Sequence, residues 1–315
     1  MPPFFSVIIP TYNRATLIRR AIDSALSQSF TDFEIVVVDS ASTDGTREVV
    51  RAYAEAHPNV RLVCEESRRG VCPARNLAIE HSTGEWIAPL DSDDEFPPGT
   101  LALFHEKITA KPYIACHRFM CRWDNGTLSP RPPVVNEEWD YEGYLRFADR
   151  AARSRSGEMI ACIQRSTFND VRFPEDRAYE TEYYLDFALR YRIEAHPEVA
   201  RLYHTDATDQ NSYVPNPAHW LRVAPDCARS LSRVITKHGE AMARVAPSAY
   251  NDLLRTAAKF YFLSGDRRAG LRYMRMLWSH ERLAPVSVGI LGFGLLGPQA
   301  LAWADAKRAA FRRPV

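Results

Sequence analysis

The chain has 315 residues, of which 46% are hydrophobic and 25% are charged, as is ordinary for a globular protein. This length accommodates one large α/β domain with an appendage, or two modest domains. The 40 lysines and arginines nearly balance the 39 acidic residues. A nucleic-acid-binding module normally carries a basic excess, so we expect no nucleic acid among the partners of this chain.

Cysteine spacing and the start of the chain bear on the cellular compartment. The six cysteines form no C-x-x-C pair, and several lie in apolar stretches, which favours reduced, partly buried thiols. The apolar run at residues 4–9 is too short for a signal peptide and leads directly into a Pro-Thr turn. We therefore expect a cytoplasmic protein.

The first hundred residues alternate strand patterns with helix patterns. Short apolar runs predict strands at residues 4–9, 33–38, 60–64 and 86–90. Helical spacing of apolar residues predicts helices at residues 14–28, 43–57 and 73–81, the second of them capped by Ser42 or Thr43. Repeated βα units of this length predict a parallel sheet with right-handed crossovers.

Acidic and polar residues follow the ends of these strands. Thr11 follows the first strand, Asp39 the second, and Asp91-Ser92-Asp93-Asp94 the fourth. In such sheets, ligands bind outside the carboxyl ends of the strands. Three carboxylates within four residues repel one another unless a cation neutralises them. A divalent metal that carries a phosphorylated ligand would do so, and oxygen ligands of this kind suit Mg²⁺ or Mn²⁺.

Four ordered motifs carry a resemblance to a known family. They are VIIPTYNR at residues 7–14, VVVDSASTDGT at 36–46, GVCPARN at 70–76 and GEWIAPLDSDD at 84–94. Together they resemble the nucleotide-sugar-binding half of family 2 glycosyltransferases of the GT-A fold. The resemblance is strong up to Asp94 and thins out afterwards. It implies an α/β fold with a mostly parallel sheet flanked by helices, here with a C-terminal helical extension.

The resemblance also implies roles for individual residues. The first motif lines the nucleobase and ribose, and Asp39 accepts a hydrogen bond from the base, typically uracil. Arg75 lies near the base and the diphosphate. In the D-x-D motif, Asp91 is directed to the ribose and Asp93 to the metal. The implied nucleotide-sugar-binding residues are Pro10, Thr11, Tyr12, Arg14, Asp39, Arg75, Asp91, Ser92 and Asp93.

The second half of the chain is irregular until about residue 223, where the family places its acceptor-binding elements. Residues 101–108 and 141–153 predict helices, residues 113–123 a strand or a bent pair, and residues 157–164 a strand. Glu180 and Glu182 precede an amphipathic helix at residues 183–192 and resemble the family's second acidic signature, which supplies the catalytic base. The expected Asp position is Thr181, so either glutamate could be the base, with Glu180 preferred. Alternatively, both acids merely favour a helix N-terminus.

His204 lies in a polar segment, residues 202–206, that corresponds loosely to a family region after the base helix. It is a third candidate metal ligand beside Asp91 and Asp93. The competing interpretation is a hydrogen-bonded surface histidine without a metal.

The C-terminal region predicts helices from residue 225 to 281, interrupted at residues 264–266. Residues 284–304 then carry no charge and are followed by basic residues. Four glycines and Pro298 make this stretch a poor membrane span, which leaves two interpretations: a peripheral membrane contact through residues 284–315 at the inner face of the membrane, or a buried terminal helix pair. GFGLLG at residues 292–297 spells a dinucleotide fingerprint by chance, because no βαβ unit can follow it.

We therefore predict a metal-dependent, inverting glycosyltransferase of the hexosyltransferase type, with Mn²⁺ or Mg²⁺ as cofactor. It would move a sugar from a nucleotide-diphosphate sugar, preferably a UDP-sugar, to a hydroxyl of a glycan or lipid-linked glycan, as in surface polysaccharide synthesis. Residues 1–100 would bind the donor, residues 101–224 the acceptor, and residues 225–315 would form a helical region. The alternatives are a sugar-phosphate nucleotidylyltransferase and a non-catalytic relative that binds nucleotide sugars or carbohydrate.

Overall fold

The computed structural model describes residues 2–176, 180–206, 217–280 and 284–311. Its chain divides into two compact units. The first unit comprises residues 1–144, 154–176 and 183–207, and the second comprises residues 145–153, 177–182 and 208–315. Helices α5 (Tyr141–Ser154) and α6 (Thr181–Ala188) each contribute residues to both units.

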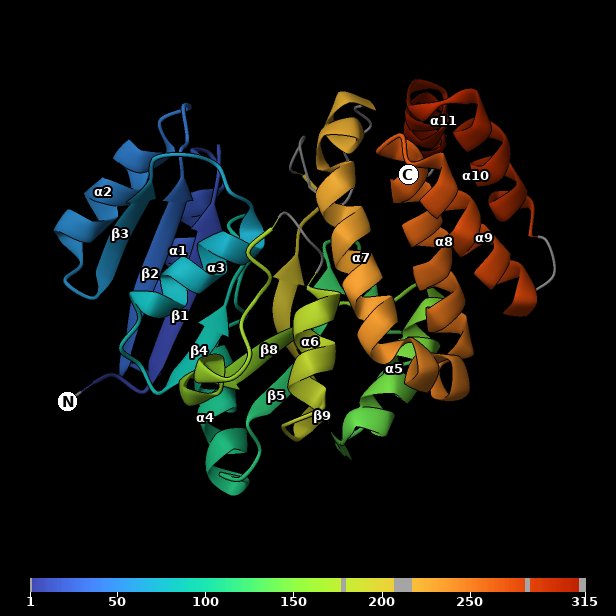
Figure 1. The fold of residues 1–315 in the computed structure, drawn as a ribbon. Helices are drawn as coiled ribbons and strands as arrows, with labels where there is room; N and C mark the ends of the chain where they lie inside the picture. Colours follow the sequence, from blue (N-terminus) through green and yellow to red (C-terminus); the bar gives the residue numbers. More distant parts are fainter. Residues whose placement is uncertain (1, 177–179, 207–216, 281–283, 312–315) are drawn as a thin grey trace. The chain divides into compact units, whose positions relative to one another are not determined.

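The first unit is built on a mixed sheet, which has nine strands in the described part of the chain. The strand order is β3-β2-β1-β4-β8-β5-β9-β7, with β6 paired to β5. Figure 1 shows the strands from β3 to β9 in this order. Its strands are β1 (Phe5–Thr11), β2 (Phe33–Ser40), β3 (Val60–Glu65), β4 (Trp86–Pro89), β5 (Cys116–Trp123), β6 (Leu128–Ser129), β7 (Glu137–Trp139), β8 (Met159–Gln164) and β9 (Ile193–Tyr203).

The first four strands are mutually parallel, whereas β8 joins β4 and β5 in antiparallel fashion. Strand β9 then pairs with β5 in parallel. The α/β fold class predicted from the sequence is confirmed, with the parallel part confined to the predicted βα repeats and to the β5–β9 pair. The strands of these repeats are buried on both faces, as their continuous apolar runs indicate.

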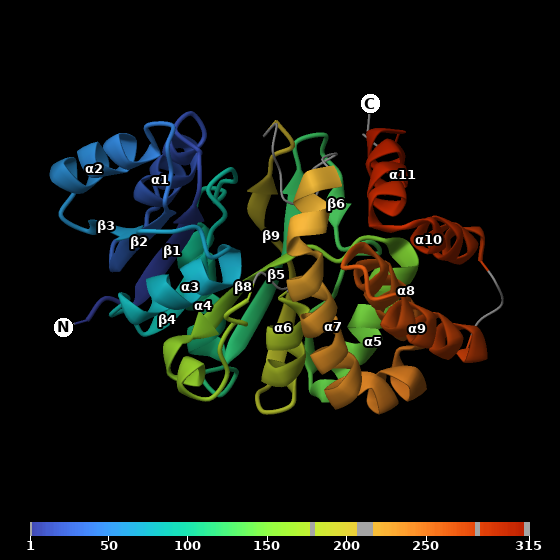
Figure 2. The ribbon, with the colours of Figure 1, turned by 45° about the horizontal axis from the view of Figure 1, so that its top comes forward.

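Helices cover both faces of the parallel strands. Alternate residues of β1, such as Val7 and Ile9, pack in one core with Ile22 of α1 and Val50 of α2. Helix α3 contacts β1 and β2 on the opposite face, as the two views in Figures 1 and 2 show. The helices of these repeats are α1 (Ile18–Leu26), α2 (Thr46–Ala56), α3 (Val71–Glu80) and α4 (Thr100–Ala110), and a 3₁₀ turn, η1 (Arg165–Asn169), follows β8.

Two predicted helix starts were wrong, because the loops before them are held by tertiary hydrogen bonds. Helix α1 begins at Ile18 rather than at residue 14, after Asn13, which has a φ of 51°. Helix α2 begins at Thr46 with Gly45 as its N-cap, at a φ of 88° that favours glycine. Ser42 and Thr43 therefore do not cap it. They bond to Asn13 instead: the backbone N–H of Asn13 donates to Ser42 Oγ, and that of Thr43 to Asn13 Oδ1.

The second unit is helical. It contains α7 (Pro217–Val245), α8 (Pro247–Leu263), α9 (Arg267–His280), α10 (Pro285–Leu296) and α11 (Pro298–Phe311), and α8 packs against α7, α9, α10 and α11 (Figure 2). The predicted break at residues 264–266 lies between α8 and α9. Residues 292–296 of the GFGLLG stretch lie in α10, and a Cβ on Gly294 would come within 2.6 Å of the Phe262 side chain. The stretch therefore allows close helix packing and forms no nucleotide-binding loop.

Candidate functional site: the carboxyl edge of the parallel strands

The predicted site residues of the first hundred positions meet at one edge of the first unit. Strand register places Thr11, the last residue of β1, opposite Asp39 of β2. Pro10 is buried one position earlier on β1. Asp91 and Ser92 follow β4 after one further residue, Leu90, and β4 lies on the other side of β1. The parallel strands thus bring these side chains to the same edge, as their sequence positions predict.

Asp39 and Thr11 present buried polar atoms at this edge. The Asp39 side chain is fully buried, and its Oδ2 accepts hydrogen bonds from the Ser42 backbone N–H at 3.1 Å and from Arg47 Nε at 2.5 Å. Asp39 Oδ1 and Thr11 Oγ1 have no hydrogen-bond partner among the described residues. Since buried polar atoms are normally paired, these two oxygens are suited to a polar ligand.

Tyr12 and Arg14 extend the site along the loop after β1. The guanidinium of Arg68 lies over the Tyr12 ring at 3.9 Å from its centroid, which forms a flat cationic and aromatic surface. The backbone N–H of Arg14 donates to Thr46 Oγ1 at 2.8 Å, which fixes this loop to the start of α2. The Arg14 side chain reaches the D-x-D motif, where Nε lies 3.7 Å from Asp93 Oδ2.

The two aspartates of the D-x-D motif have different electrostatic surroundings. Asp91 accepts a hydrogen bond from Arg75 Nη2 at 2.8 Å and pairs with Arg201 Nη1 at 3.2 Å. Burial opposes ionisation of Asp91, but these guanidinium groups hold its pKa below the ordinary value. Burial and the charge of Asp91 raise the pKa of Asp93. Asp93 is therefore the less neutralised of the two and the better suited to an added cation.

Asp94 and Arg201 form a buried pair behind the motif. Arg201 Nε lies 2.9 Å from Asp94 Oδ2, and the backbone N–H of His204 donates to Asp94 Oδ1 at 2.9 Å. Burial raises the pKa of Asp94 to about 7 despite the guanidinium beside it. Arg201 thus bridges Asp91 and Asp94 from strand β9, more than one hundred residues along the chain.

Sequence reasoning missed Arg201 and Arg20. The side chain of Arg20 on α1 donates to the Asp93 backbone carbonyl and to Asp206 Oδ2, the latter at 2.9 Å. An arginine within the otherwise apolar end of a strand was the available signal for Arg201, because a buried charge requires a partner. The sequence carries no comparable signal for Arg20, which lies on an ordinary amphipathic helix.

His204 contacts an acid other than the D-x-D carboxylates. Its Nε2 lies 2.7 Å from Glu95 Oε1. Within the described ranges, one group of three potential ligand side chains has its ligand atoms within 4.8 Å of one another, and this group is His117, Glu194 and His196. The ligand atoms of Asp91, Asp93 and His204 do not all lie within this distance of one another.

The two candidate bases belong to the second unit. Glu182, in the first turn of α6, pairs with Arg233 through both carboxylate oxygens, at 2.8 Å from Nε and 2.8 Å from Nη2, and accepts a longer hydrogen bond from Ser230. Glu180 lies half-buried just before the helix. The carboxylate of Glu182 is thus occupied by an arginine within its own unit.

Comparison with known proteins places these motifs in a family. Residues 6–171, just over half of the chain, match the model of the family described as Glycosyl transferase family 2. A Haloferax volcanii protein named glycosyltransferase AglE is 41% identical over 93 residues, which cover 29% of this chain and 31% of that protein. A Bacillus subtilis protein, the putative teichuronic acid biosynthesis glycosyltransferase TuaG, is 39% identical over 94 residues, 30% of this chain and 37% of its own. The matches thus span about a third of the length of these curated relatives.

Solved structures share the fold over nearly the whole chain. S. aureus TarS 1–349, solved in complex with UDP-GlcNAc, has a TM-score of 0.60 and 19% identity, and the match covers 99% of this chain and 92% of that one. The mannosyltransferase PcManGT from Pyrobaculum calidifontis, solved with GDP-Man and Mn²⁺, has a TM-score of 0.51 and 24% identity, with coverages of 100% and 89%. At these identities the likeness establishes the GT-A type of fold alone.

Proposed function

Since the chain belongs to glycosyl transferase family 2, we propose that it transfers a sugar from a nucleotide-diphosphate sugar to a hydroxyl of a glycan or lipid-linked glycan, with inversion at the anomeric carbon. The observation that carries this proposal is the pair of unsatisfied buried oxygens on Asp39 and Thr11, at the same sheet edge as the D-x-D carboxylates. One end of this edge suits a nucleoside and the other a diphosphate. Surface polysaccharide synthesis is the process that we propose, as for the teichuronic acid relative.

We assign the nucleoside to Asp39, Thr11 and Tyr12. A fully buried carboxylate oxygen is a strong acceptor for the imide N–H of uracil, so we propose a UDP-sugar as the preferred donor. The Tyr12–Arg68 pair would stack on a planar base. Pro10 and Ser92 would shape the pocket beside the ribose, near Asp91.

We assign the diphosphate to the D-x-D motif and its arginines. Mg²⁺ or Mn²⁺ bound through Asp93 would neutralise charge on the departing diphosphate as a Lewis acid. Asp93 fits such an ion because its carboxylate is largely buried and its arginine contact is long, at 3.7 Å. Arg14 and Arg75 would orient phosphate oxygens, and Asp91 and His204 are the further ligands that we propose to test. Neutralising the negative charge that develops on the departing diphosphate usually contributes most to the rate of such a transfer.

We propose Glu180 as the catalytic base. It would take the proton of the acceptor hydroxyl as that oxygen attacks the anomeric carbon and the nucleotide diphosphate leaves. Glu182, whose two carboxylate oxygens are engaged by Arg233, is the alternative base. In this scheme residues 1–100 bind the donor, residues 101–224 bind the acceptor, and residues 225–315 form an accessory helical region.

A panel of nucleotide sugars tests the proposal. Release of free nucleotide diphosphate supports transfer, pyrophosphate-linked chemistry would indicate a nucleotidylyltransferase, and silence with all donors would indicate a non-catalytic relative. Asp93→Ala should abolish both turnover and metal-dependent nucleotide binding. If this variant keeps donor binding and transfer, the assignment of the diphosphate site is wrong.

A matched pair of variants tests the base. Glu180→Gln should reduce transfer at saturating donor by about two to four orders of magnitude, while nucleotide binding is retained. Glu182→Gln should retain most of the activity and lose stability through its ion pair with Arg233. The reverse result would assign the base to Glu182.

We further propose a peripheral membrane contact through residues 284–315. No helix of the described segments is long and apolar enough to cross a membrane. Helices α10 and α11 nevertheless expose large apolar side chains, among them Leu296 at 75% and Trp303 at 56%, and Lys307 Nζ lies 5.8 Å from the Trp303 ring centroid. Apolar residues beside cations are typical of interfacial helices.

Liposome sedimentation tests this contact. A truncation would uncover the core side chain Phe262, so substitutions of exposed residues are the better variants. Leu296→Glu combined with Trp303→Glu should weaken sedimentation with anionic vesicles and leave folding unchanged. Equal partitioning of this variant and the parent would favour the alternative of a terminal helix pair that only completes the fold.

A further inference from the structure

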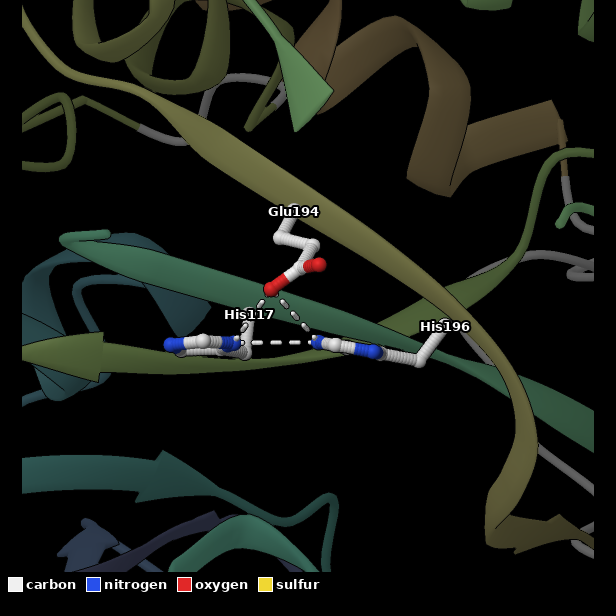
Figure 3. A group of neighbouring side chains, drawn as sticks. All are labelled: His117, Glu194 and His196. Carbon is white, nitrogen blue, oxygen red and sulfur yellow. Dashed lines mark hydrogen bonds and ion pairs between the residues drawn. The ribbon is translucent and has the colours of Figure 1, made fainter. Parts of the chain in front are cut away.

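Three metal-ligating side chains meet inside the first unit, away from the D-x-D motif. His117 lies on β5, and Glu194 and His196 lie on β9 (Figure 3). The parallel register pairs His117 with Glu194, and Phe119 with His196. Successive side chains of a strand alternate between faces, so His117, Glu194 and His196 share one face of the two strands. All three are buried.

The ligand atoms of these side chains converge on one point. His117 Nδ1 lies 3.0 Å from His196 Nε2, and Glu194 Oε2 lies 3.7 Å from each of these nitrogens. With metal–ligand bonds of about 2.0–2.1 Å, these separations correspond to angles of about 95–130° at a common ion. The three angles sum to about 350°, so the ion would lie close to the plane of its three ligand atoms, with a position above or below that plane left for water. Figure 3 shows the carboxylate oxygen above the contact between the two rings.

A second layer of contacts orients two of the three ligands. His196 Nδ1 lies 3.2 Å from Asn136 Oδ1, which fixes the ring so that Nε2 is the free ligand nitrogen. Lys111 Nζ donates to Glu194 Oε1 at 2.7 Å and leaves Oε2 to face the histidines. Metal-bound histidines commonly donate their other N–H to such an oxygen, and ligating carboxylates are hydrogen-bonded in turn.

The surroundings favour the neutral form of both histidine rings, which is the form that binds a metal. The Phe119 ring stacks on His196 at 4.6 Å between centroids, and Trp86 lies beside His117. Burial lowers the pKa of His117 to about 3 and that of His196 to about 4, so both rings are neutral near pH 7. A hydrogen-bonded pair of neutral rings would account for the 3.0 Å contact. The carboxylate oxygen of Glu194, held by Lys111, faces both nitrogens at a distance too long for a hydrogen bond, so the contact between the rings alone does not distinguish a metal site from such a pair.

We propose that His117, Glu194 and His196 bind one transition-metal ion, with Zn²⁺ as the expected class, in a structural site separate from the D-x-D motif. Two imidazoles and a carboxylate suit Zn²⁺, whereas an all-oxygen set suits Mg²⁺ or Mn²⁺.

The position of the site on β9 indicates its role. The β5–β9 register shifts between Phe119 and Cys121, immediately after the His196 pairing. Arg201 follows this irregularity and reaches Asp91 and Asp94. An ion that joins β5 to β9 just before the shift would fix the register that delivers Arg201 to the acidic cluster.

The test uses the full chain, purified without a metal-affinity tag and stripped with a chelator. Titration with Co²⁺ should produce the visible absorption of a tetrahedral ion at one equivalent, and Zn²⁺ should displace it. Zn²⁺ should also raise the Tm of the stripped parent, which requires no variant to fold. Mg²⁺ should produce neither effect.

Variants locate the ion. His117→Gln and His196→Gln should lose the Co²⁺ spectrum, and Asn136→Ala should weaken Co²⁺ binding by about 10–100-fold. Asp93→Asn, at the other candidate metal site, should keep the full spectrum. Absence of the Co²⁺ band in the parent together with no Tm shift on Zn²⁺ addition would identify a neutral hydrogen-bonded pair and overturn the proposal. A band that persists in folded His196→Gln would overturn it equally.

Discussion

The buried carboxyl of Asp94 should make the stability of the first unit depend on pH in a way that one substitution removes. Its pKa is about 7 in the folded protein, against an ordinary value of 3.8. Between these values the folded state holds a proton that the unfolded state releases, so this group destabilises the protein as pH rises. The penalty grows by about 2.5 kcal/mol between pH 5 and pH 8, because each pKa unit corresponds to about 1.4 kcal/mol.

Asp94→Asn isolates this contribution. The amide cannot ionise, so it places a neutral side chain beside Arg201 at every pH and removes the pH-dependent penalty of ionising the buried carboxyl. Groups such as His117 titrate alike in both proteins and cancel in the difference. In urea denaturation with EDTA, the free energy of unfolding of the variant minus that of the parent should therefore increase by about 2.5 kcal/mol from pH 5 to pH 8. A difference that stays constant within about 0.5 kcal/mol would refute the buried, protonated state of Asp94.

Two further stability predictions come from close contacts. Gly294→Ala should cost about 1–3 kcal/mol in the thermal unfolding of the second unit, because its Cβ would overlap Phe262; Gly292→Ala on the same helix has open space and should be neutral or slightly stabilising. Equal Tm values for the two variants would contradict the packing of α10. Arg201→Met should lower the free energy of unfolding by about 3–5 kcal/mol in urea denaturation, because it removes the buried partner that Asp91 and Asp94 share. Arg201→Lys, which keeps the charge, should cost less in the same assay.

The βα half of the fold was predictable because its signals are local. Strands buried on both faces appear as apolar runs, and the polar residues that follow them lie at one edge whenever the strands are parallel. Thr11 and Asp39 are paired in the sheet as that reasoning requires. The helix starts at residues 14 and 43 were predicted wrongly, because the bonds between Asn13 and the loop of Ser42 and Thr43 join segments about thirty residues apart.

The candidate site likewise contains residues that local motifs reveal and residues that only long-range pairing brings in. Asp91, Asp93 and Arg75 were recognisable from ordered motifs near one another in the chain, and their roles in donor binding stay predictions. The sequence could indicate that Arg201 needs a partner but not which one, because Arg201 reaches the acidic cluster through the pairing of β9 with β5. The engagement of Glu182 by Arg233, fifty-one residues along the chain, was likewise beyond a local pattern.

The sequence by itself determined the family, the parallel strands and the acidic edge, since each depends on residue type and short spacing. Tertiary structure alone decided which charges neutralise which. Asp91 has two arginines, Asp93 has a long contact to one, and Asp94 is driven toward its protonated form by burial. It also placed His117 beside His196, seventy-nine residues apart, through strand register. Electrostatic energies depend on distance and burial in space, and neither quantity is encoded in the spacing of residues along the chain.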